Sequence, residues 1–142
     1  MTSVYRFEDK GNLNVDLIDE LVAQGHRVDV MTPVERRHQP HARMTTYPSL
    51  RVIEFPCLNF RGKVNLIEKG FSTLSLGYLY RHHIRKYLTG SSYDFAIYTT
   101  LPTTYGPALH YLKKRHGTFC YLLHKDIFPQ SAVDLGLITP RS

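Results

Sequence analysis

The sequence has few of the residues that build disulfide frameworks or metal sites. Its two cysteines, Cys57 and Cys120, lie far apart, without CxxC spacing and without a nearby histidine pair at the spacing of zinc ligands. Eight histidines are present, but they form no ligand pattern with carboxylates. The sequence therefore favours reduced thiols and predicts no disulfide, no metal site and no cofactor.

A long uninterrupted apolar run is also missing. The longest mainly apolar stretch, residues 64–79, contains Glu68 and Lys69 and is too short and polar to cross a bilayer. Residues 1–6 lack the basic segment and long apolar core of a signal peptide. We therefore expect a cytoplasmic protein, with peripheral contact at the inner membrane face as an alternative.

Tryptophan is absent and acidic residues are outnumbered. The ten tyrosines fall on expected strands and helix faces, not in the basic aromatic segments of RNA-binding sheets, so nucleic acid is not expected as a partner. Lys and Arg number 18 against 12 Asp and Glu, which gives a net charge of +6. This excess favours anionic partners such as a phospholipid surface or phosphorylated small molecules.

The length and pattern of the chain predict one domain over residues 1–142. At 142 residues, with 42% hydrophobic and 21% charged residues, the composition is globular. Helical spacing of apolar residues predicts helices over residues 13–22, 64–88 and 104–116. Strands are expected over residues 27–31, 50–56, 93–100 and 118–123, with a fragmentary first strand at residues 1–5. This order predicts an α/β fold, a Rossmann-like parallel sheet with helices on both faces.

Several local features refine this expectation. Asn12 is placed to cap the first helix and Gly25 to end it, whereas Gly70 and Gly77 are weak points in the second helix. Residues 34–49 are expected to form a long functional or mobile loop. Because residues 118–123 are almost continuously apolar, they suit the centre of a parallel sheet that is covered on both faces.

Candidate binding residues follow the expected strands. Ligands of such sheets bind beyond the carboxyl ends of the strands. The residues found there are Lys10, Gly11, Glu35, Arg36, Arg37, Thr100, Pro102, Lys125 and Asp126. Their cations, with the N-terminus of the first helix, are suited to a phosphate or pyrophosphate.

Each group also has a structural interpretation. Lys10 and Gly11 are favoured as part of a turn and cap, because no glycine-rich phosphate loop is present. The Glu35–Arg37 run is as well explained by a solvated loop, and the basic clusters at residues 81–86 and 113–116 suit the ends of helices whatever the function. Asp126 follows a strand expected to be buried and must be solvated or paired, so a role in a cleft is favoured over an ion pair with Lys125 that only caps the strand.

These segments resemble the N-terminal domain of bacterial family 4 glycosyltransferases, in the branch that builds O-antigen and capsular or exopolysaccharide. The likeness covers almost the whole chain. It is carried by Glu35–Arg37, by residues 65–70 and 98–102, and most specifically by residues 122–136, with Lys125 and Asp126 where many relatives have His-Asp.

The resemblance implies a GT-B enzyme with two Rossmann-like domains. The N-terminal domain holds mainly the acceptor, whereas the C-terminal domain binds the nucleotide-sugar and supplies a paired-glutamate motif. By likeness, this chain helps to transfer a glycosyl unit, with retention of configuration, to a saccharide or lipid-linked acceptor in cell-surface polysaccharide or lipopolysaccharide synthesis. Asp126 is then the candidate catalytic residue, and the other candidates bind acceptor or phosphate.

The same likeness predicts a fragment. Residues 1–5 match only the end of a first strand, and residues 139–142 stop before the expected C-terminal domain. Donor and acceptor are therefore expected as partners only in a full-length enzyme. The chain alone should be inactive. A noncatalytic binding module is the alternative, either half of a split enzyme or a domain that docks on an anionic membrane. A different α/β enzyme with phosphate substrates is disfavoured by the missing glycine-rich loop.

Overall fold

The structure is a computed structural model, and it describes residues 11–58, 66–99 and 103–124. The chain divides into two compact units, Met1–Leu76 and Gly77–Ser142. Helix α2 (Leu66–Tyr87) passes from the first unit into the second.

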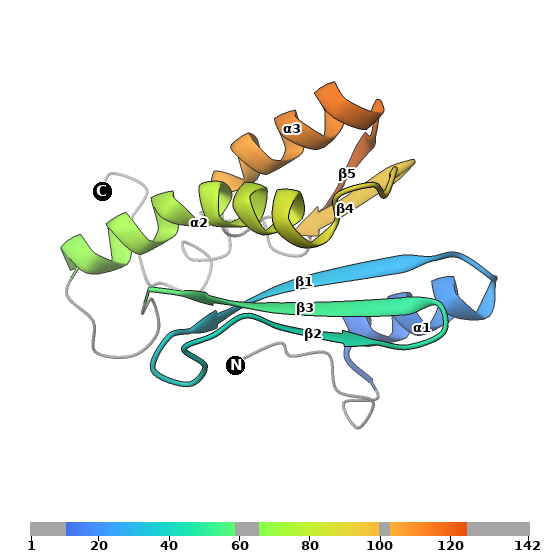
Figure 1. The fold of residues 1–142 in the computed structure, drawn as a ribbon, viewed down its shortest axis with the longest axis horizontal. Helices are drawn as coiled ribbons and strands as arrows, with labels where there is room; N and C mark the ends of the chain where they lie inside the picture. Colours follow the sequence, from blue (N-terminus) through green and yellow to red (C-terminus); the bar gives the residue numbers. More distant parts are fainter. Residues whose placement is uncertain (1–10, 59–65, 100–102, 125–142) are drawn as a thin grey trace, which may run out of the picture. The chain divides into compact units, whose positions relative to one another are not determined.

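The first unit is built on a small mixed sheet (Figure 1). It contains β1 (Val28–Glu35), β2 (Arg43–Thr46) and β3 (Leu50–Cys57) in the order β1-β3-β2. Strands β1 and β3 are parallel, whereas β2 is antiparallel to β3. The buried residues Ile53 and Phe55 place β3 at the centre of this core.

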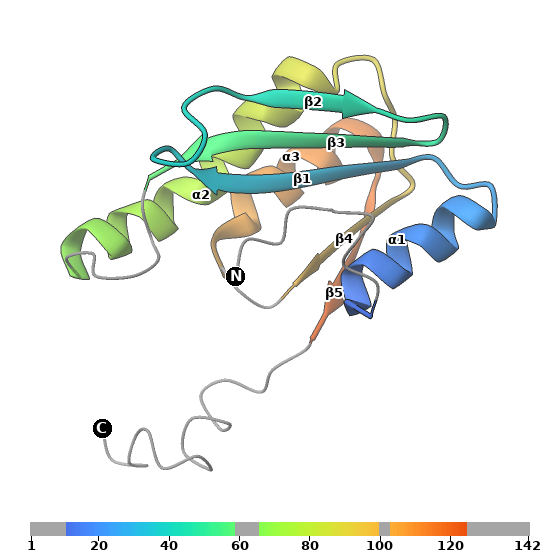
Figure 2. The same cartoon turned by 90° about the horizontal axis from the view of Figure 1, so that it is seen from below.

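Helix α1 (Leu13–Ala23) lies alongside β1 in Figure 2. The Asn12 side chain accepts a hydrogen bond from the Asn14 N–H at 3.0 Å, and Gly25 follows the helix with a φ of +86°. The buried Val15 packs with Leu50 and Val52 in one apolar cluster. The predicted helix, its cap and its glycine end are thus confirmed.

The second unit holds a two-stranded parallel sheet. Strands β4 (Phe95–Thr99) and β5 (Phe119–Leu123) pair in register and are joined through the 3-10 turn η1 (Thr103–Tyr105) and helix α3 (Gly106–His116). Proline near the start of α3 and Gly117 at its end, with a φ of +69°, set the limits of that helix.

Tyrosines form the centre of the second unit. The ring centroid of Tyr105 lies 5.0 Å from that of Tyr80 and 5.9 Å from that of Tyr98, in both cases edge to face. Gly77 is buried, and a Cβ there would lie 1.9 Å from the carbonyl oxygen of Thr104. Gly77 therefore allows α2 and η1 to pack closely. This role was not predicted from the sequence, where Gly77 was expected only to weaken the helix.

The prediction of a mixed α/β fold is confirmed, with three α-helices among the described residues. Strand β2 lies inside the segment expected to be a loop, and β1 runs beyond its expected end at Met31, through Pro33 to Glu35. The expectation of a long loop over residues 34–49 was therefore wrong in part. The two sheets are separate in hydrogen bonding, so the finer Rossmann-like arrangement stays a prediction, and residues 1–5 lie outside the described part.

The expected burial of β5 is wrong. The side chains of Phe119 and Tyr121 are 71% and 62% exposed, and Leu122 is also exposed. The apolar composition of this strand favoured burial on both faces, but only β4 pairs with it in the described residues. In the same residues no helix has both the length and the apolar character needed to span a membrane.

Candidate functional site

The carboxyl ends of β1 and β3 meet at Glu35 and Cys57. Parallel register places these two residues opposite each other, and both are buried. The Arg36 N–H donates a hydrogen bond to the Cys57 carbonyl oxygen at 2.9 Å, which continues the pairing for one more residue. The chain then leaves the sheet at the edge where ligands of parallel sheets are commonly bound.

Glu35 is a buried carboxylate that is paired within its own turn. Its side chain is 5% exposed, and its Oε2 accepts hydrogen bonds from Arg37 Nε at 2.9 Å and Arg37 Nη2 at 2.5 Å. His38 Nε2 lies 3.7 Å from the same oxygen. Because a buried charge is costly unless it is paired, Glu35 and Arg37 stabilise each other.

The backbone of this turn is also held by Glu35. Its carbonyl oxygen accepts hydrogen bonds from the N–H of His38 at 2.8 Å and of Gln39 at 3.1 Å. Glu35 thus fixes the turn through both its side chain and its backbone. A residue bound in this way positions its neighbours and is poorly suited to contact a ligand directly.

Arg36 and Arg37 are both exposed in this turn, but only Arg37 is paired with Glu35. The Arg36 side chain makes no hydrogen bond or ion pair among the described residues. Its guanidinium can therefore donate two hydrogen bonds to an anion without breaking a contact to another described residue. Of the three candidates in this run, the geometry favours Arg36 for binding, with Arg37 and Glu35 as support.

Gly11 lies in the turn before α1. Its φ is +91°, and its N–H donates a hydrogen bond to Asp16 Oδ1 at 3.3 Å. With Asn12 capping the helix and Asp16 in the first turn, the N-terminus of α1 already has negative groups of its own. This arrangement agrees with the turn-and-cap interpretation. Among the described residues no hydrogen bond or ion pair joins Gly11 to the Glu35–Arg37 turn.

The remaining candidates, Lys10, Thr100, Pro102, Lys125 and Asp126, lie outside the described residues. Their neighbours in the second unit are partly characterised. Thr99 ends β4 opposite Leu123, and its side chain hydrogen-bonds with Tyr105. Burial of Tyr105 raises the pKa of its phenol above the usual value, and hydrogen bonds with Tyr80 and Thr99 partly offset that rise. Tyr105 therefore stays protonated as a structural hydroxyl.

The second unit contains a pocket, with a volume of about 330 Å³, that was not predicted from the sequence. The pocket lies where α2 ends and α3 ends, and it is lined by Ile84, Leu88, residues 89–92, Tyr111, Arg115 and His116. Residues 113–116 were expected only to complement the helix dipole. The sequence feature that could have pointed to this pocket is the hydroxyl-rich segment 89–92, which follows the second helix directly.

Among residues 11–58, 66–99 and 103–124, no three His, Cys, Asp or Glu side chains gather as a metal site would require. Comparison with known proteins found no matching family, no matching curated protein and no matching solved structure.

Proposed function

We propose that this chain is the acceptor-binding domain of a glycosyltransferase that acts in cell-surface polysaccharide synthesis. The family resemblance of the sequence supplies the reaction class. The observation that carries the proposal is the Arg36 turn, in which the buried Glu35 carboxylate, paired with Arg37, holds an exposed Arg36 guanidinium at the carboxyl end of a parallel strand. A Rossmann-like sheet and a second domain for the nucleotide-sugar are part of this proposal.

The chemistry of the turn suits an acceptor linked through a diphosphate. A guanidinium donates two parallel hydrogen bonds to phosphate oxygens, and a pre-ordered turn lowers the entropic cost of binding. Asp126 is proposed to orient the reacting hydroxyl or the Lys125 ammonium, on the basis of sequence likeness. In a complete enzyme, Asp126→Asn and Lys125→Ala should lower the transfer rate.

Binding of a soluble acceptor analogue to the 142-residue chain tests the proposal. The probe is a monosaccharide linked through a diphosphate to a short isoprenyl chain, and affinity is measured by NMR titration. Loss of one bidentate charged contact should weaken binding about tenfold in Arg36→Gln. Arg43→Gln removes the same charge from the exposed strand β2 and should leave the affinity within about twofold of the parent chain.

Two results would contradict the proposal. One is a failure of the chain to bind any diphosphate-linked saccharide. The other is an equal loss of affinity in Arg36→Gln and Arg43→Gln, because binding would then follow overall charge and not the turn after β1.

A further inference from the structure

The pocket of the second unit is lined by residues other than those at the strand ends just described. Its residues come from the last turn of α2, from residues 88–92, which precede β4, and from the C-terminal half of α3. It therefore lies toward the amino ends of β4 and β5, opposite the ends marked by Thr99 and Leu123. Its volume of about 330 Å³ is at the lower end of the range for small-molecule sites.

The walls of this pocket combine apolar and polar groups. Ile84 and Leu88 are buried and supply an apolar surface, to which Tyr111 adds part of an aromatic ring. The segment 89–92 contributes three hydroxyl side chains and Gly90, whose φ of +89° turns the chain back towards β4. Such a surface can contact the carbon skeleton of a small molecule and hydrogen-bond to its polar groups.

Arg115 and His116 supply positive or donor groups on the opposite wall. The His116 ring meets the Tyr111 ring at a centroid distance of 6.5 Å and the Tyr93 ring at 6.2 Å, both edge to face. The imidazole is therefore positioned by two aromatic neighbours. The guanidinium of Arg81 lies 6.0 Å from the Tyr111 ring centroid and adds a further cation beside this wall.

Two helix C-termini at the pocket would by themselves favour a cation. Each contributes roughly half a negative charge from its last carbonyl groups. Some of those carbonyl oxygens already accept hydrogen bonds. The Leu88 carbonyl accepts from the Ser91 N–H at 3.1 Å, the Lys113 carbonyl from the Gly117 N–H at 3.0 Å, and the Arg85 carbonyl from the Thr89 hydroxyl.

Formal charges outweigh the helix dipoles in this region. The described residues from 77 onward include six Lys and Arg but a single acidic residue, Asp94. Arg115 alone offsets the two half-charges, and the other cations make the potential positive. The pocket is therefore suited to an anion.

We propose that this pocket binds a small, water-soluble organic phosphate. The Arg115 guanidinium and the exposed Ser92 hydroxyl donate to the phosphate oxygens, while Leu88 and Tyr111 contact the organic part. This site shares no residue with the turn at Arg36. Binding here does not depend on the proposed glycosyltransferase function.

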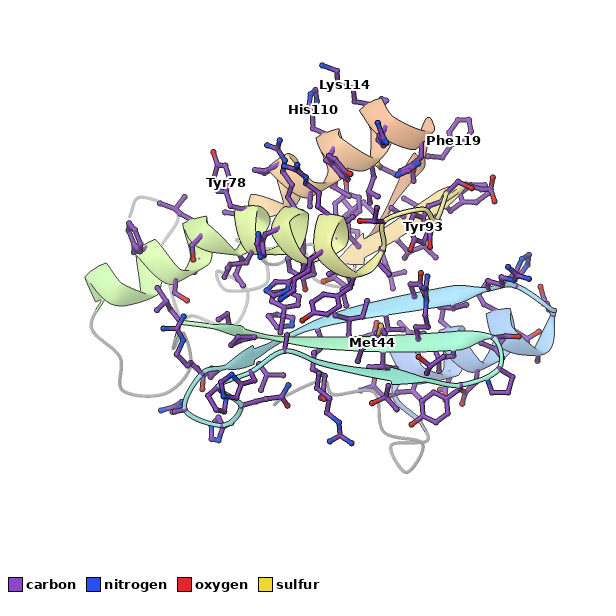
Figure 3. The ribbon with its side chains drawn as sticks, viewed as in Figure 1. Met44, Tyr78, Tyr93, His110, Lys114 and Phe119 are labelled. Atoms are coloured by element: carbon purple, nitrogen blue, oxygen red, sulfur yellow. The ribbon has the colours of Figure 1, made fainter. Side chains whose placement is uncertain are left out.

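Titration of the 142-residue chain with glucose 1-phosphate, inorganic phosphate and glucose tests the inference by calorimetry and NMR. Glucose 1-phosphate is expected to bind more tightly than either other probe, because it uses both the charged and the apolar walls. Arg115→Gln should weaken its binding at least tenfold. Lys114→Gln is the matched control, because Lys114 has the same charge, lies one residue away and points outward from α3 (Figure 3), and it should change affinity less than twofold.

A second variant guards against misfolding of the first. Ser92→Asp adds a negative charge at an exposed lining position and should abolish phosphate binding while leaving the far-ultraviolet circular dichroism unchanged. Arg36→Gln should leave glucose 1-phosphate binding unchanged. The inference is overturned if glucose 1-phosphate does not bind, if Lys114→Gln and Arg115→Gln lose affinity equally, or if Ser92→Asp binds as well as the parent chain.

Discussion

Gly77 limits how closely the chain can pack around α2. A Cβ at this position would lie 1.9 Å from the Thr104 carbonyl oxygen and 3.0 Å from Pro107 Cδ. Alanine improves helix propensity by about 1 kcal/mol, but overpacking against backbone costs about 1–3 kcal/mol or more. We therefore expect Gly77→Ala to lower the free energy of unfolding by about 2 kcal/mol, as measured by urea denaturation.

Gly106 provides the matched control. It begins α3 without a positive φ, and apart from its two chain neighbours and the backbone of α3, no heavy atom lies within 4 Å of the Cβ that alanine would add. Gly106→Ala should therefore leave the midpoint of denaturation unchanged or raise it slightly. Equal effects of the two substitutions would show that α2 does not approach η1 closely in solution.

His83 makes stability depend on pH. It is buried in α2, and desolvation lowers the pKa of its imidazole from 6.5 to about 4, with further lowering by His82 and Lys86. Between these two pKa values the unfolded chain binds a proton that the folded chain does not. The contribution of neutral His83 is therefore fully present above pH 6.5 and is lost as the pH falls towards 4, by about 3 kcal/mol in total.

Denaturation at a series of pH values checks this expectation. His83→Phe keeps a ring to stack on Tyr87, whose centroid lies 5.8 Å away, but it cannot titrate. Its free energy of unfolding should fall less steeply between pH 6.5 and 4 than that of the parent chain. His110→Gln, at an exposed position of α3, should keep the steep fall. The assignment fails if His83→Phe and the parent chain show the same slope.

The β4–β5 sheet leaves one apolar face exposed. Strand alternation and the pairs Phe95↔Phe119 and Ile97↔Tyr121 place four exposed side chains on the same side. The rings of Phe95 and Phe119 are 5.9 Å apart across the two strands. An exposed, paired apolar face of this kind favours association between molecules.

Dye binding and light scattering measure this tendency. The double variant Phe95→Ser/Phe119→Ser should bind less of the apolar dye ANS and scatter less light as protein concentration rises. Phe71→Ser removes an equally exposed ring from α2 and should have a smaller effect, because that ring lies on a different element. If Phe71→Ser reduces dye binding as much, the sheet face is not the main apolar surface.

Local signals predicted some elements well and others poorly. Helix α1 could be predicted from its apolar spacing, Asn12 and Gly25, because these act within a few residues of sequence. Strand β2 has only four residues, mostly exposed, and is held by pairing with β3, so no alternating pattern could identify it. The exposure of β5 could not be predicted either, because the residues that cover a strand are distant from it in sequence.

The candidate site, too, could be predicted only in part from the sequence. That Glu35–Arg37 lies at the end of a parallel strand could be predicted from strand order, although the strand ends at Glu35 and not at Met31 as expected. The turn geometry and the end of β1 determine that Glu35 is buried and bound by Arg37, while Arg36 is exposed. Neither could be predicted from the sequence. The pocket near Arg115 unites two segments, residues 84–92 and 111–116, so the hydroxyl-rich run 89–92 could not reveal it alone.

Across the whole molecule the positive charge is unevenly distributed. Met1–Leu76 has ten Lys and Arg against nine Asp and Glu, whereas Gly77–Ser142 has eight against three. Nearly all of the net charge of +6 therefore belongs to the second unit. An anionic surface should attract that unit first, and attraction between exposed charges should weaken as salt rises.

Binding to vesicles with and without anionic phospholipid tests this asymmetry. Arg85→Gln/Lys114→Gln and Arg27→Gln/Arg43→Gln each remove two exposed positive charges, the first pair from the second unit and the other from the first unit. The parent chain should bind the anionic vesicles at low salt, and the loss at higher salt should be steep. Each removed contact near the surface is worth about 1 kcal/mol, so the second-unit variant should lose much more affinity than the first-unit variant. Equal losses in the two variants would mean that net charge alone governs the interaction, and that the concentration of cations on α2 and α3 has no separate effect.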